Sequence, residues 1–125
     1  MATFVAVKNT LDALVAMADI PRMKRRHGGD NFSWNTAEEL RNAGAQIAGT
    51  AYRLIAPECV GNGKADETFL VRILSGPLDQ EDLPQMPFRG PFATINQIKV
   101  IRDWINEGAL DDSKRQADPI WRGLR

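Results

Sequence analysis

The sequence has a single cysteine, Cys59, and a single histidine, His27. One cysteine excludes an intramolecular disulfide and any metal site built from several cysteines. We expect Cys59 to be a small, semi-buried side chain. Cys59 has no obvious base beyond His27, and no Gly-x-Ser-x-Gly motif is present. The residues therefore form no catalytic constellation that the sequence alone identifies.

The chain also has no excess of charge and no long apolar run. Its 16 basic and 16 acidic residues cancel, which gives no global reason to expect nucleic acid or an anionic membrane as a partner. No apolar run approaches the roughly 20 residues of a membrane span. The N-terminus does not have the charged and apolar regions of a signal peptide. These absences predict a cytoplasmic protein without a nucleic-acid or membrane partner.

Apolar residues recur at helical spacing in four segments. They predict helices from Thr3 to Ala18, Thr36 to Gly49, Asp66 to Ser75 and Thr94 to Glu107. Thr36 and Thr94 each begin a capping box. Residues 77–93 hold four of the seven prolines, which predicts a long but stiffened loop. The pattern predicts an all-α domain over residues 1–110 and a tail over residues 111–125.

Three segments of the C-terminal half form a recognisable series: residues 69–74, then Met86-Pro87-Phe88-Arg89-Gly90-Pro91, then residues 98–109, which include Trp104-Ile105-Asn106-Glu107-Gly108-Ala109. The series resembles the end of bacterial cytochrome c domains, where a Met-Pro loop joins two helices. The resemblance implies a small cytochrome c-like domain of three to five helices with Met86 as the distal haem ligand. His27-Gly28-Gly29-Asp30 resembles the residues that follow the haem-binding cysteines, with His27 at the proximal position.

The chain departs from that family at the haem-attachment cysteines. Met23 and Arg26 occupy the two cysteine positions, and neither residue forms a thioether bond to haem. Non-covalent haem ligated by His27 and Met86 stays possible. Alternatively, aromatic side chains of the two flanking segments fill the cavity. These side chains are Phe32, Trp34, Phe88 and Phe92. Met23, His27 and Met86 have side chains of the types that bind copper, but no other feature of the sequence supports a copper site.

Two segments carry candidate partner contacts. Arg22, Lys24, Arg25 and Arg26 form the one dense basic cluster, which either attracts an acidic partner or is a solvated loop. Trp121 and Leu124 lie among arginines at the chain end and either fold back on the domain or dock on a partner.

The sequence therefore leaves three functional hypotheses. We expect a haem-free, cytochrome c-like accessory subunit without catalytic activity of its own, bound to a partner enzyme. The alternative is electron transfer through non-covalent haem held by His27 and Met86. A third hypothesis is an enzyme whose site the sequence does not reveal.

Overall fold

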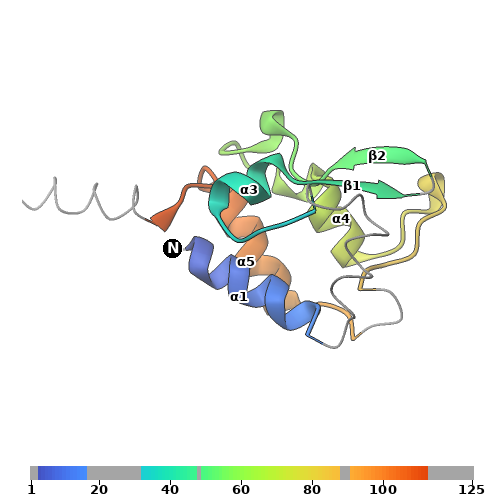
Figure 1. Ribbon diagram of the computed structural model, residues 1–125, viewed down its shortest axis with the longest axis horizontal. Helices are drawn as coiled ribbons and strands as arrows, with labels where there is room; N and C mark the ends of the chain where they lie inside the picture. Colours follow the sequence, from blue (N-terminus) through green and yellow to red (C-terminus); the bar gives the residue numbers. More distant parts are fainter. Residues whose placement is uncertain (1–2, 17–31, 48, 88–90, 113–125) are drawn as a thin grey trace, which may run out of the picture.

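The computed structural model describes residues 3–16, 32–47, 49–87 and 91–112 (Figure 1). This part of the chain contains four α-helices and one antiparallel hairpin. The helices are α1 (Phe4–Leu14), α3 (Ala37–Asn42), α4 (Phe69–Ser75) and α5 (Ile95–Asn106), and the strands are β1 (Gly44–Ile47) and β2 (Thr50–Arg53). Short 3-10 turns lie at Pro57–Cys59, Ala65–Glu67 and Asp79–Glu81.

The all-α fold class predicted from the sequence is wrong, because the second predicted helix ends early and continues as a hairpin. Ala43 caps α3 with extended backbone angles, and its carbonyl accepts the N–H of Leu54 at 3.1 Å. Ala43 and Ala45 are buried while Gln46 is exposed, which is the period of a strand. Gly49, at φ +83°, lies in the turn between the strands. A short apolar segment does not distinguish helix from strand by its spacing alone.

The other helix bounds also differ from the predicted ones. The first predicted helix is too long, because α1 ends at Leu14 with Val15 as its C-cap, short of the predicted Ala18. Thr68 begins α4, because its hydroxyl accepts the N–H of Val71 at 3.2 Å, so the helix starts later than Asp66. Thr94 and Gln97 form the complete capping box of α5. At Thr36 only half of the box forms, since the Glu39 carboxylate accepts instead from the Ser33 hydroxyl at 2.8 Å.

The core lies between the helices, and the hairpin borders it through the buried Ala45. α1 and α5 run antiparallel side by side (Figure 1), and Phe4 meets Trp104 with ring centroids 5.6 Å apart. The large side chains with almost no exposure come from α1, α3, α5 and the segment after β2. They are Val7, Leu40, Ile55, Ile101, Trp104 and Ile105, joined by the buried Thr68 at the start of α4.

Candidate functional site

Of the residues proposed for a haem site, Met86 lies in the described part of the chain and His27 lies outside it. The loop before Met86 closes on itself, since Leu78 and Leu83 exchange backbone hydrogen bonds of 2.9 and 3.0 Å. Met86 then donates its N–H to the carbonyl of Ile73 at 2.9 Å, and its half-buried side chain packs against the core. The end of α4 therefore positions Met86, and the side chain contributes to packing.

The other predicted contacts are only partly described. Arg22, Lys24, Arg25, Arg26, Trp121 and Leu124 lie outside the described residues, as does Phe88. Phe32 and Trp34 are half-buried, meet edge to face with centroids 5.3 Å apart, and pack against the core. Phe92 differs from them, because 48% of its surface is exposed. Of the three described aromatic residues proposed to fill one cavity, Phe32 and Trp34 therefore lie at the margin of the core, and Phe92 lies at the surface.

The Trp-Ile-x-x-Gly-Ala segment ends α5 as a Schellman motif. Ala109 donates its N–H to the carbonyl of Trp104 at 2.9 Å, and Gly108 donates to Ile105 at 3.2 Å. This motif places its C′ residue in the left-handed region, and Gly108 has φ +113° there. The Trp104 indole N–H donates to the carbonyl of Leu110 at 2.9 Å. The segment that carries the family resemblance therefore has a structural role in this chain that needs no haem.

The same helix end holds the loop before α4. The Ile105 carbonyl also accepts the N–H of Gly61 at 2.9 Å, and the Asn106 side chain accepts the N–H of Ala65 at 3.0 Å. Cys59 is buried and free beside this loop, so its thiol is a small packed side chain as expected. The end of α5 therefore binds both the residues that follow it, 108–109, and the loop of residues 61–65, which is distant in sequence.

Asp12 on α1 forms a polar cluster with Lys8 and Trp34 that the sequence analysis missed. Its carboxylate accepts from Lys8 Nζ at 2.7 Å and from the Trp34 indole at 2.9 Å. The hydrogen bond from Lys8, followed by that from Trp34, holds the pKa of the Asp12 carboxyl below its usual range. An Asp four residues after a Lys on a helix is the sequence signal for the first contact, whereas the second depends on tertiary structure.

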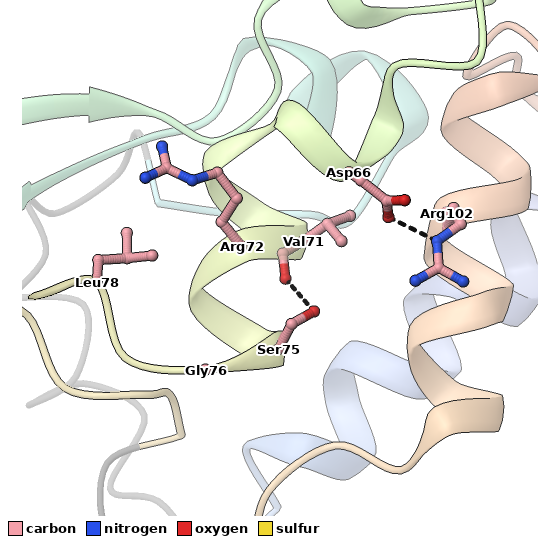
Figure 2. A pocket seen from close by; sticks show the side chains of 7 residues that line it. All are labelled: Asp66, Val71, Arg72, Ser75, Gly76, Leu78 and Arg102. Atoms are coloured by element: carbon pink, nitrogen blue, oxygen red, sulfur yellow. Dashed lines mark hydrogen bonds and ion pairs between the residues drawn. The ribbon is translucent and has the colours of Figure 1, made fainter.

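A groove of about 440 Å³ lies along α4, between α5 and the loop that follows α4 (Figure 2). In Figure 2, Arg102 projects from α5, whereas Arg72 projects from α4 with its guanidinium group directed away from Arg102. Arg102 Nε donates to Asp66 at 2.6 Å, and its terminal nitrogens have no hydrogen-bond partner among the described residues. Arg72 lies 3.7 Å from Glu81, beyond hydrogen-bond distance. Both guanidinium groups therefore keep donors for an external acceptor.

The groove has the chemistry of a contact surface. The Ser75 hydroxyl donates its proton to the carbonyl of Val71 at 2.6 Å, which is a helix-backbone contact and not a contact with a general base. Within the described ranges, no three histidine, cysteine or acidic side chains come together as a metal site. The donors of Arg72 and Arg102 suit carboxylate or phosphate oxygens.

Comparisons with family models, curated proteins and solved structures gave no match to this chain. A search of the described helices found none with the length and apolar character needed to cross a membrane.

Proposed function

We propose that this chain is a haem-free, cytochrome c-like accessory domain that binds a partner protein and has no catalytic activity of its own. The observation that carries the proposal is the exposed face of α5. Ile95 is 83% exposed, and Arg102 lies about two helical turns further on, so the two residues share one face. An exposed apolar side chain and an arginine with free donors on the same helix face are typical of protein interfaces.

The groove extends this face with polar contacts. Arg102 lines the groove together with Arg72, and Phe92 adds an exposed ring just before α5. We name Ile95, Arg102 and Arg72 the α5 surface. Asp66 and Glu81 balance the charges of the two arginines. The surface therefore fits a partner that presents an apolar side chain next to oxygen acceptors for the remaining guanidinium donors.

The haem-free part of the proposal is supported by Met86. Its backbone is bonded to the end of α4 and its side chain packs against the core, so packing alone accounts for a methionine at this position. Met23 and Arg26 at the positions of the haem cysteines support it further.

Affinity capture from the native host tests partner binding. The chain with Ile95→Gln or Arg102→Gln should recover a specific partner at least about tenfold less well than the unmodified chain, by quantitative mass spectrometry. Val5→Gln is the matched control, because Val5 is also a β-branched apolar residue in the first turn of a helix, α1, and is 56% exposed. It lies outside the α5 surface. Equal recovery by all variants would exclude the α5 surface as the binding site.

Deletion of residues 119–125 examines the second proposed contact. If Trp121 and Leu124 dock on the partner, the deletion weakens capture and leaves thermal unfolding of the domain unchanged. Unchanged capture removes the tail from the interface. The basic residues Arg22, Lys24, Arg25 and Arg26 are examined in the same assay by replacement with glutamine.

An absorption spectrum recorded with added haem separates the proposal from electron transfer. A colourless protein that takes up no haem supports the accessory role. A Soret band that disappears in both His27→Ala and Met86→Ala would instead establish haem ligation and overturn the haem-free proposal.

A further inference from the structure

The outer edge of β2 carries backbone groups that the hairpin does not use. β1 and β2 pair Gln46 with Ala51, and the Leu54 N–H continues this register by donating to Ala43. Hydrogen-bonded and non-bonded pairs alternate along an antiparallel ladder. The Ala43–Leu54 bond therefore places the backbone N–H and C=O groups of Ala51 and Arg53 on the side of β2 that faces away from β1.

This edge is open. Thr50, Ala51 and Arg53 are exposed and Tyr52 is half-buried. Among the described residues, the N–H groups of Ala51 and Arg53 have no hydrogen-bond partner in another segment. In Figure 1, β2 lies at the rim of the molecule with β1 on its inner side. An unpaired edge of this kind is a template for a further strand.

The one charged side chain of β2 is held away from the edge. Arg53 Nε donates to the carbonyl of Ile55 at 3.1 Å, and a terminal nitrogen donates to the carbonyl of Arg41 at 2.9 Å. Charged side chains and prolines commonly block strand edges in proteins. β2 contains no proline, and its arginine is bonded to its own chain, so neither device protects this edge.

We propose that β2 pairs antiparallel with β2 of a second copy of this chain, with Tyr52 at the two-fold axis. In this register Ala51 lies opposite Arg53 of the partner subunit, and each such pair exchanges two backbone hydrogen bonds. A two-fold axis makes the contact self-complementary, so all outward groups of Ala51 and Arg53 are satisfied together. A shift by two residues in one direction would place Arg53 opposite the hairpin turn of the partner subunit. In the other direction it would place Arg53 opposite its own copy, where like charges repel.

Tyr52 gives this register a side-chain contact. Its ring stacks on Phe69 with centroids 4.6 Å apart and an interplanar angle of 16°. At the axis, Tyr52 faces its own copy in a non-hydrogen-bonded pair, where opposite side chains are closest. The second copy therefore extends the aromatic stack, which an unrelated strand does only if it carries an aromatic residue at that position.

Sedimentation equilibrium up to the millimolar range tests the proposal on the full chain. The unmodified protein should show a reversible monomer–dimer equilibrium. Ala51→Lys places an ammonium group opposite Arg53 of the partner subunit, whereas Ala51→Glu places a carboxylate there. We expect dissociation constants that differ by about tenfold or more, with the glutamate variant the tighter dimer.

A second pair of variants examines the backbone contact at the same position. Ala51→Pro removes an outward N–H without removing a β1–β2 hydrogen bond, so the dimer should be lost. Ala51→Val keeps the N–H and should keep the dimer. Circular dichroism verifies that each variant is folded. A protein that stays monomeric at every concentration, or a dimer insensitive to both pairs of variants, would overturn the proposal.

Discussion

Trp104 connects the last described helix to the core by two different interactions. Its side chain is fully buried against Phe4, and its indole N–H satisfies the carbonyl of Leu110. Trp34 makes a comparable indole hydrogen bond to Asp12, but at the surface. The two tryptophans therefore separate the effect of burial from the effect of the hydrogen bond.

We predict that Trp104→Phe lowers the free energy of unfolding by about 2–3 kcal/mol, because it leaves a cavity and an unsatisfied carbonyl. Trp34→Phe, the matched control, should cost less than about 1 kcal/mol, because solvent replaces the lost hydrogen bond. Urea denaturation measures both values. Equal losses in the two variants would contradict the assignment of Trp104 to the core.

Asp12 gives the stability of the protein a predicted dependence on pH. Because folding lowers the pKa of Asp12 below its ordinary 3.8, its stabilising contribution is present above pH 3.8 and is lost as the pH falls through the folded value. The contribution is small, since the carboxylate is 47% exposed.

An NMR titration of the Asp12 carboxyl measures this effect directly. Lys8→Met should raise the pKa toward 3.8 by more than Trp34→Phe does, because the hydrogen bond from Lys8 is the larger cause. The unfolding free energies of the unmodified chain and Asp12→Ala should converge at acid pH. A pKa of Asp12 that neither variant moves would show that these bonds do not form in solution.

At the scale of elements, the ends of helices determine how the segments meet. The end of α5 binds Gly61 and Ala65, and the end of α4 binds Met86. Asp112, the last described residue, contacts the start of α1. Its carboxylate accepts the N–H groups of Phe4 at 2.9 Å and of Val5 at 3.1 Å. Residues that terminate or cap a helix therefore also fix its neighbours.

Two glycines that end helices should respond differently to alanine. Gly108, at φ +113°, is in the left-handed region, so Gly108→Ala should destabilise the protein by about 1–2 kcal/mol. Gly76 is extended, and an added Cβ there meets no atom within 4 Å. Gly76→Ala should be neutral or stabilise by up to about 1 kcal/mol, because it restricts the unfolded chain. Thermal unfolding of both variants provides the comparison, and a destabilising Gly76→Ala would be evidence against this account.

At the scale of the whole molecule, the described helices enclose a core of aliphatic and aromatic side chains that includes Met86 at its margin. If this packing is the function of Met86, Met86→Leu should cost less than about 1.5 kcal/mol, because it conserves volume and apolarity. Met86→Ala should cost about 2 kcal/mol or more.

Addition of haem should leave the melting temperature of the unmodified chain unchanged. A ligand that binds only the folded state raises the melting temperature with its concentration, so thermal unfolding reports binding without an activity assay. A rise that Met86→Leu abolishes would show that the thioether is a ligand and that packing is not its only role.

The capping residues show how much of the fold the sequence determined. Thr94 with Gln97, and Gly108 with Ala109, act through neighbours within one turn, so the spacing of residue types predicted α5 almost to its observed ends. The apolar stripe predicted for the first helix contains Phe4, Val7, Leu11, Leu14, Val15 and Ala18. Its first three members are buried in α1, the next two are half-buried, and the last lies outside the described residues.

Tertiary structure decided the rest. Residues 43–47 follow a helix and have no strong strand pattern, and only their pairing with residues 50–54 and burial of Ala45 against the core make them a strand. Three further features could not be predicted from the spacing of residues in the sequence. They are the Asp12–Trp34 contact, the groove lined by Arg72 and Arg102, and the open edge of β2. Helix caps depend on residues within about one turn of each other, so the sequence predicts them. Contacts between segments distant in sequence form only when the chain folds around a common core, so the sequence does not predict them.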